Sequence, residues 1–172
     1  MNIFETCKIK SIAKGTILLR QGEICKIGCK VIAGCLKSYV LDDTGKEHIM
    51  QFAPEGWIIT DMNSLFNNVP SDITIEAIED SEVYWIESEM LDIWGNASRE
   101  VLLEQINMLR RNIITANKRT RMLLSSTSEE RYIDFIQTYP SLTQRLPLKL
   151  IAAYIGITPE YLSEIRRKVA SK

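Results

Sequence analysis

The stretch LKLIAAYIGITPEYLSEIRRK, residues 148–168, constrains the fold of this 172-residue chain more than any other segment. Gly156 can take the positive φ of a tight turn, and Thr158 followed by Pro159 suits the first turn of a new helix. Ala152 is small enough for two helices to cross closely there. The apolar positions are spaced to form the shared core of such a pair: Ile151, Ile155, Ile157, Leu162 and Ile165.

This spacing is typical of a DNA-binding helix-turn-helix, and an ordinary αα-hairpin is the alternative. In the first interpretation the N-terminal part of the second helix enters the major groove, where Glu160 can accept a hydrogen bond from cytosine N4. Cations farther from the helix tip are better placed for phosphate contacts, and they are Lys149, Arg166, Arg167 and Lys168. The predicted DNA-contacting residues are Lys149, Thr158, Pro159, Glu160, Tyr161, Ser163, Glu164, Arg166, Arg167 and Lys168.

The charge distribution is also uneven along the chain. The net charge is −1 overall, but residues 1–109 carry −8 and residues 110–172 carry +7. Such asymmetry suggests that the basic part meets a polyanion such as nucleic acid. A solvated basic helix surface without a partner is the alternative, and charge alone does not separate the two.

Residues 98–126 contain neither proline nor glycine and predict one long helix. Their apolar positions recur at alternating steps of four and three, which is the a/d pattern of a coiled coil. We therefore expect a homodimer interface, although packing of this helix on its own domain is the alternative. The predicted dimer seam consists of Leu102, Ile106, Leu109, Ile113, Ala116, Thr120 and Leu123.

Shorter helices are expected on both sides of this long one. The sequence SEMLDIW, residues 88–94, predicts a helix with Ser88 as its N-cap. Beyond residue 126, cap-forming serines and a threonine precede two glutamates, which favours a second helix start. Tyr139-Pro140 predicts the end of that helix.

Residues 10–87 predict a region of short β-strands. Glycines separate the apolar runs TILLR, LKSYVL and EHIMQF, and the runs ITIEAI and EVYWIE follow. Strand-like runs at this regular spacing indicate an all-β sandwich or barrel. Within the region, DMNSLF, residues 61–66, predicts a short helical turn.

The sequence gives little support for catalysis or for membrane insertion. His48 is its only histidine, and it has no nucleophile–base pair, phosphate loop or good metal-ligand spacing. No stretch approaches the roughly 20 apolar residues of a membrane span, and the first residues lack a signal-peptide core. We therefore expect a cytoplasmic protein that is not an enzyme and holds no metal.

β-Strands punctuated by glycine, a long heptad helix and a C-terminal helix-turn-helix, in this order, resemble the Crp/Fnr transcription regulators. The segments that carry the resemblance are KGTILLRQGE (14–23), AGCLKSYVLDDTGKEHIMQFAPEGW (33–57) and LPLKLIAAYIGITPEYLSEIRRK (146–168). The resemblance implies an α+β fold in three parts. These are an N-terminal, jelly-roll-like β-roll of the cyclic-nucleotide-binding type (1–97), a dimerisation helix (98–126) and a DNA-binding helix-turn-helix domain (127–172).

The ligand motif departs from that of the cyclic-AMP-binding relatives, which have a Gly-Glu pair and then an Arg-Ser pair that grips the cyclic phosphate. The corresponding candidate ligand-binding residues here are Asp61, after Thr60, and the pair Ser71-Asp72. A phosphate beside Asp72 with no nearby cation would be electrostatically unfavourable. Cyclic AMP is therefore not expected, which leaves another small-molecule effector or none.

The cysteines raise a second question, because sensors of the Fnr type hold an iron–sulfur cluster. Cys25, Cys29 and Cys35 are closely spaced, as cluster ligands can be. They fall inside the predicted strands, however, and the first spacing differs from that of the family. We interpret them as buried structural residues and expect no cluster.

The predicted function is therefore that of a bacterial, homodimeric, DNA-binding transcription regulator of the Crp/Fnr type. Its predicted partners are double-stranded DNA, a second copy of the chain and an unknown small-molecule effector, with RNA polymerase as a further candidate. The alternative is a ligand-binding or protein-interaction module whose helix-turn-helix does not bind DNA. Salt-dependent duplex binding distinguishes the two.

Overall fold

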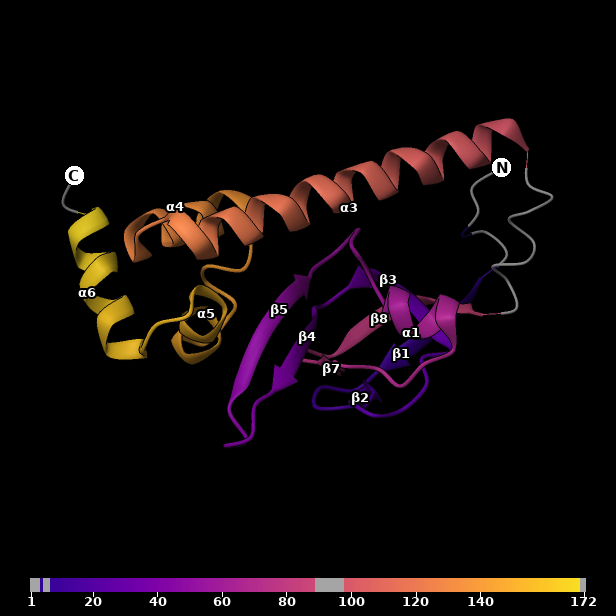
Figure 1. The fold of residues 1–172 in the computed structure, drawn as a ribbon, viewed down its shortest axis with the longest axis horizontal. Helices are drawn as coiled ribbons and strands as arrows, with labels where there is room; N and C mark the ends of the chain where they lie inside the picture. Colours follow the sequence, from indigo (N-terminus) through magenta and orange to yellow (C-terminus); the bar gives the residue numbers. More distant parts are fainter. Residues whose placement is uncertain (1–3, 5–6, 89–97, 171–172) are drawn as a thin grey trace. The chain divides into compact units, whose positions relative to one another are not determined.

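The computed structural model describes residues 4, 7–88 and 98–170 (Figure 1). The chain divides into two compact units, Met1–Gln105 and Ile106–Lys172. The strands are β1 (Lys8–Ile12), β2 (Ile17–Leu19), β3 (Ile27–Ala33), β4 (Leu36–Leu41), β5 (Glu47–Ala53), β6 (Ile58–Ile59), β7 (Thr74–Ala77) and β8 (Ser81–Glu87). The helices are α1 (Met62–Asn67), α3 (Arg99–Ser125), α4 (Ser128–Thr138), α5 (Leu148–Ile155) and α6 (Pro159–Ala170).

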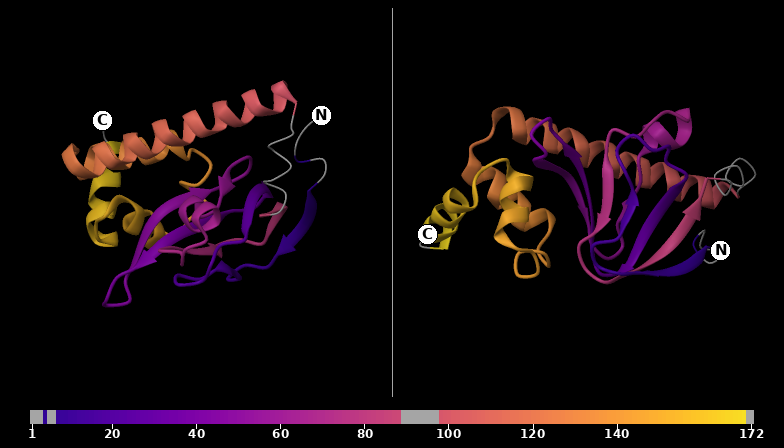
Figure 2. Two further views of the ribbon diagram at one scale, coloured as in Figure 1. Left: turned by 45° about the vertical axis from the view of Figure 1, so that its right-hand side comes forward. Right: turned by 90° about the horizontal axis from the view of Figure 1, so that it is seen from below.

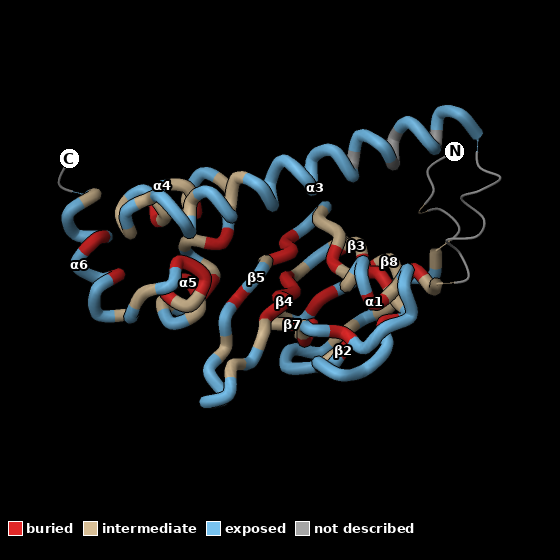
Figure 3. Tube along the Cα trace, viewed as in Figure 1, coloured by how far each residue is buried: buried red, intermediate tan, exposed pale blue. Residues whose placement is uncertain are grey.

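The first unit is built from two four-stranded antiparallel sheets, with strand orders β1-β8-β3-β6 and β2-β7-β4-β5. Apolar side chains from both sheets form one buried core, as the red segments of Figure 3 indicate. The members of this core are Leu19, Cys25, Cys29, Val31, Leu36, Ala53, Ile59, Ile75, Ala77 and Val83. The predicted N-terminal β-roll is confirmed.

The apolar runs of the sequence form β2, β4, β5, β7 and β8, as predicted. The helical turn expected at residues 61–66 is also confirmed: Asp61 caps α1 by accepting a hydrogen bond from the Ser64 amide at 3.1 Å. The helix predicted over residues 88–94 lies outside the described residues, except for Ser88.

One glycine turn is set by close packing as well as by backbone conformation. Gly34, between β3 and β4, has a φ of +88°. A β-carbon at this position would lie 2.4 Å from Ser81 Oγ and 2.5 Å from the Asp80 carbonyl oxygen. Only glycine fits here without displacing β8, because both contacts are far inside van der Waals distance.

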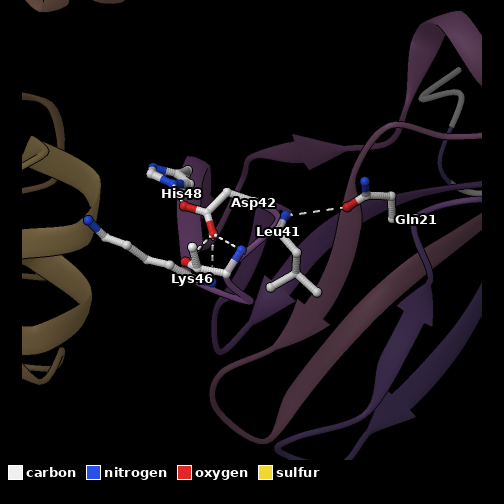
Figure 4. A network of polar contacts seen from close by, with 6 residues as sticks. Gln21, Leu41, Asp42, Lys46 and His48 are labelled. Atoms are coloured by element: carbon white, nitrogen blue, oxygen red, sulfur yellow. Dashed lines mark hydrogen bonds and ion pairs between the residues drawn. The ribbon is translucent and has the colours of Figure 1, made fainter.

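The β4–β5 hairpin is closed by the carboxylate of Asp42 (Figure 4). Its Oδ1 accepts hydrogen bonds from Thr44 N at 2.9 Å, Thr44 Oγ1 at 2.6 Å and Lys46 N at 3.1 Å. Its Oδ2 lies 2.7 Å from His48 Nε2. The hydrogen bonds from Thr44 and His48 hold the pKa of Asp42 well below its usual value, because they stabilise the charged carboxylate.

The second unit contains most of α3 together with α4, α5 and α6, which gather at the C-terminal end of α3 (Figure 2). The long helix predicted over residues 98–126 is confirmed as α3. A capping box starts α4, since Thr127 Oγ1 accepts from Glu130 N and the Glu130 carboxylate accepts from Thr127 N at 2.7 Å. The helix ends before Tyr139, as the Tyr139-Pro140 pair predicts.

Candidate nucleic-acid interface

The turn between α5 and α6 has the geometry that the sequence predicts. Gly156 ends α5 in the left-handed region with a φ of +80°, and its amide donates to the Ala152 carbonyl oxygen at 2.9 Å. Thr158 then caps α6 by accepting a hydrogen bond from Tyr161 N at 3.3 Å. Pro159 is the first residue of α6, where a missing amide hydrogen costs nothing. The predicted helix-turn-helix is therefore confirmed as a fold.

Below this turn lies a buried core that fixes how α5 and α6 pack. Of the five predicted core residues, Ile151, Ile155, Leu162 and Ile165 are at most 4% exposed, while Ile157 is half-buried. The core continues into α4 through three aromatic rings, with centroids 5.6 Å apart in each pair: Phe135, Tyr139 and Tyr154. Such packing holds α6 firmly on α4 and α5.

The residues predicted to contact DNA lie almost entirely on the surface of this unit. Pro159 is half-buried, and the others are exposed: Lys149, Thr158, Glu160, Tyr161, Ser163, Glu164, Arg166, Arg167 and Lys168. The Ser163 hydroxyl donates to the Pro159 carbonyl oxygen at 3.0 Å, so it is partly engaged within α6. The remaining polar side chains give α6 an exposed face that carries hydroxyl, carboxylate and cationic groups, as base and phosphate contacts require.

Lys168 has an additional partner that the sequence did not predict. Its Nζ lies 2.9 Å from Oε2 of Glu129 in the first turn of α4. This hydrogen bond and the attraction between the two charges raise the pKa of Lys168. A hollow of about 340 Å³ surrounds the pair, lined by Thr127, Ser128, Glu129, Tyr161, Glu164, Ile165 and Lys168. No local pattern reveals such a contact, because the two charged residues are 39 positions apart along the chain.

The predicted dimer seam lies on the exposed surface of α3 (Figure 3). Leu102, Ile106, Leu109, Ile113 and Leu123 have fractional exposures of 39–60% in the single chain, and Ala116 and Thr120 are also exposed. Thr120 Oγ1 donates to the Ala116 carbonyl oxygen at 3.1 Å, so its hydroxyl can approach an apolar partner without losing a hydrogen bond. Exposed apolar positions at heptad spacing are what a second helix would cover.

In the first unit, two of the three candidate ligand residues bond to each other. Ser71 Oγ donates to Asp61 Oδ2 at 2.7 Å, and it also accepts from Ile73 N at 3.1 Å. The other oxygen of Asp61 caps α1, and Ser71 is 2% exposed. Asp72 is exposed on the adjoining loop. Asp61 and Ser71 therefore stabilise the loop around α1, which accounts for these residues without a ligand.

Comparison with known proteins gives a match in the first unit. Residues 9–92 match the family model of the cyclic nucleotide-binding domain. Among solved structures, one neighbour is FixK2 from Bradyrhizobium japonicum, with a TM-score of 0.80 and 20% identity over 96% of this chain and 85% of that one. Another is a regulator assigned to the crp/fnr family from Eubacterium rectale, with a TM-score of 0.72 and 18% identity over 98% and 81% of the two chains.

The chain has the Crp/Fnr fold. The expected resemblance is thereby confirmed at the level of the fold. The c-di-GMP responsive global regulator CLP from Xanthomonas campestris is also similar, with a TM-score of 0.72 and 14% identity over 98% of this chain and 88% of that one. No curated protein sequence matches the chain.

Within this Crp/Fnr fold the closely spaced cysteines are buried, as predicted. Cys25, Cys29 and Cys35 are at most 2% exposed. Burial, and to a lesser extent the neighbouring Cys25, raises the pKa of the Cys29 thiol to about 12. This shift is what burial of a structural cysteine produces, because an apolar environment disfavours the charged thiolate. In the described part of the chain, no three His, Cys, Asp or Glu side chains come together as a metal-binding cluster.

None of the described helices combines the length and the apolar character that a membrane span needs.

Proposed function

We propose that the chain is a homodimeric transcription regulator that binds duplex DNA through α5 and α6. In this proposal residues 1–97 form a sensory β-roll, residues 98–126 the dimerisation helix and residues 127–172 the DNA-binding domain. The observation that carries the proposal is the α5–Gly156–α6 geometry, with an exposed polar face at the N-terminal half of α6. The net charge of +7 over residues 110–172 favours a polyanionic partner.

The side chains of α6 divide into two roles in this proposal. Glu160, in the first turn, accepts a hydrogen bond from cytosine N4 in the major groove. Arg166 and Arg167, with Lys149 at the start of α5, contact phosphates and set the register. Lys168 serves the same purpose only if its ammonium group bridges a phosphate and Glu129, because it already lies 2.9 Å from that carboxylate. Glu164 needs a hydrogen-bond donor on a base, or a cation beside it, to offset the repulsion between its carboxylate and the DNA phosphates.

The dimer proposed through the α3 seam determines the form of the DNA target. Two chains related by a two-fold axis present two α6 helices to one face of the duplex. They enter successive major grooves about 34 Å apart, so the target is an inverted repeat with half-sites roughly one helical turn apart.

Selection from a pool of random duplexes tests this proposal. The wild type should enrich an inverted repeat. Glu160→Ala should change the base preferred at one position of each half-site, with a loss of discrimination of about 1–3 kcal/mol. Arg166→Gln is the matched variant, because it should weaken binding to all sequences alike and reduce the salt slope by about one unit for each lost phosphate contact.

A selection that enriches no inverted repeat would contradict the proposal. So would a Glu160→Ala protein that selects the same sequence as the wild type. A flat salt dependence in all variants would instead support the alternative function, a protein-interaction or ligand-binding module whose helix-turn-helix does not bind DNA.

The β-roll is proposed to sense a small molecule other than cyclic AMP. The support is the pair of carboxylates, Asp61 and Asp72, near the place where the cyclic-AMP-binding relatives have the arginine that grips the phosphate. RNA polymerase is a further proposed partner.

A further inference from the structure

The C-terminal end of α5 is held by two arginines from other helices of the second unit. Arg131, in the first turns of α4, donates from Nε to the Ile155 carbonyl oxygen at 2.9 Å. The same guanidinium donates from Nη1 to the Ser126 carbonyl oxygen at 2.8 Å and from Nη2 to Ser128 Oγ at 3.2 Å. One side chain therefore joins the end of α5 to the short connection between α3 and α4.

Arg119, on α3, holds the neighbouring carbonyl. Its Nη2 donates to the Tyr154 carbonyl oxygen at 3.0 Å, and its guanidinium carbon lies 3.6 Å from the centroid of the Tyr154 ring. The ring is itself part of the buried aromatic group with Phe135 and Tyr139. Arg119 thus contacts both the backbone and the side chain of the last turn of α5.

These contacts fall where a helix most needs them. The last carbonyl groups of a helix have no partner within it, and they carry the negative end of the helix dipole. Two cationic donors satisfy the Tyr154 and Ile155 carbonyls, directly before the Gly156 turn that leads into α6. An ion pair between Lys118 and Asp134 adds a further link between α3 and α4.

We propose that Arg119 and Arg131 are positioning residues that fix the α5–α6 turn to the C-terminal end of α3. This inference rests on the proposed function and deepens it. In a dimer paired through α3, the distance between the two α6 helices depends on α3 and on how firmly these two side chains fix α5 and α6 to it. The arginines therefore determine how narrowly the protein selects the spacing between two half-sites, while the bases read by α6 remain unchanged.

Variants of Arg119 and Arg131 should lose selectivity for the half-site spacing, whereas a variant that only lowers the stability of the fold should not. Affinities are measured for inverted repeats at the best spacing and at spacings one base pair longer or shorter. In Arg131→Lys, which keeps the charge but not the planar fork, the preference for the best spacing should fall roughly threefold to tenfold, as expected when charge-assisted hydrogen bonds are lost. The double variant Arg119→Gln/Arg131→Gln should show the larger fall, and the preferred bases should not change.

Arg121→Gln is the matched control, because Arg121 is an exposed arginine two residues farther along α3. It should retain the wild-type spacing preference. If the Arg119 and Arg131 variants lose affinity equally at every spacing, or keep the wild-type preference, the positioning role is wrong.

Hydrogen exchange without DNA separates this inference from the proposed function. The amides around the end of α5, residues 153–157, should exchange faster in both arginine variants than in the wild type and in Arg121→Gln. Unchanged exchange rates of these amides would refute the positioning role of Arg119 and Arg131, whatever the DNA-binding result. If the wild type binds no duplex, the proposed function fails, and the exchange data still decide whether the two arginines hold the turn.

Discussion

In the first unit, two of the three side chains predicted to meet a ligand bond to each other, whereas most of the α6 side chains predicted to meet DNA lie in solvent. Asp61 and Ser71 share a hydrogen bond of 2.7 Å, and Ser71 is buried. Glu160, Arg166 and Arg167 are exposed on one helix whose opposite face is held by a tight core.

The two sites differ in the existing interactions that each would lose when it binds its partner. A ligand at Asp61 and Ser71 would have to replace hydrogen bonds that already exist, which costs binding free energy unless it supplies equivalent partners. Apart from the Lys168–Glu129 ion pair and the Ser163 hydrogen bond within α6, a duplex at α6 would mainly replace water around exposed side chains. In the proposed function, the second unit therefore binds DNA without rearranging its core, and a signal molecule in the first unit either remodels the α1 loop or binds elsewhere in the roll.

The largest expected effect comes from breaking the α3 seam. Replacing Leu109 and Ile113 by aspartate should yield monomers in sedimentation experiments, because both positions are apolar and exposed at heptad spacing. Affinity for the inverted repeat should fall roughly 100-fold or more, since each half-site then binds alone. Asn112→Asp adds charge to the same helix outside the seam and should remain dimeric. A wild-type protein that is monomeric at micromolar concentration would refute the seam.

Two glycine substitutions compare how closely the turns of the two units are packed. Gly34→Ala should lower the free energy of unfolding by about 3 kcal/mol, because it adds a clash with Ser81 and Asp80 to a strained φ. Gly156→Ala should cost about 1 kcal/mol, since the site has open space and only the φ of +80° opposes a side chain. Chemical denaturation measures both. Equal losses in the two variants would contradict the packing described at Gly34.

A smaller effect, dependent on pH, is expected in the β4–β5 hairpin. The pKa of Asp42 is lowered in the folded state, so its charge stabilises the hairpin above the ordinary pKa of 3.8, and this contribution is lost as the pH falls through the folded-state value. Asp42→Asn should therefore be less stable than the wild type at neutral pH, and the difference should narrow in acid. A denaturation series across pH on both proteins measures this difference, and a gap that stays the same at every pH would contradict the role of the Asp42 charge.

The smallest expected signal is that of cyclic AMP. Calorimetry should show no saturable heat at micromolar concentrations, because the loop around Asp61 and Ser71 is already hydrogen-bonded and carries carboxylates where the phosphate would lie. Micromolar or tighter binding would overturn the interpretation of this loop.

The sequence predicts the parts of this molecule that depend on neighbouring residues. The α3 helix, the Thr158 cap, the Gly156 turn and the helical turn at residues 61–66 follow from local sequence patterns. The five apolar runs likewise predict strands, since alternation and turn glycines are local properties.

Such local patterns do not predict contacts between residues that are far apart in the sequence. The hydrogen bond from Arg119 to Tyr154 spans 35 positions, and the pairing of β1 with β8 joins the two ends of the roll. An arginine that packs on a tyrosine has the same sequence signature as one in solvent, so its role appears only with the fold. The Glu129–Lys168 pair was missed for the same reason.

The division into two units has a practical consequence for spectroscopy. Trp57 and Trp85 pack against the core of the β-roll, and Trp94 lies outside the described residues, while α4, α5, α6 and most of α3 belong to Ile106–Lys172. Emission from Trp57 and Trp85 therefore follows the melting of the β-roll, and far-ultraviolet circular dichroism follows mainly the helical unit. A single unlabelled sample can thus show whether the β-roll and the helical unit melt together or apart, because coincident transitions by the two probes indicate one cooperative unit.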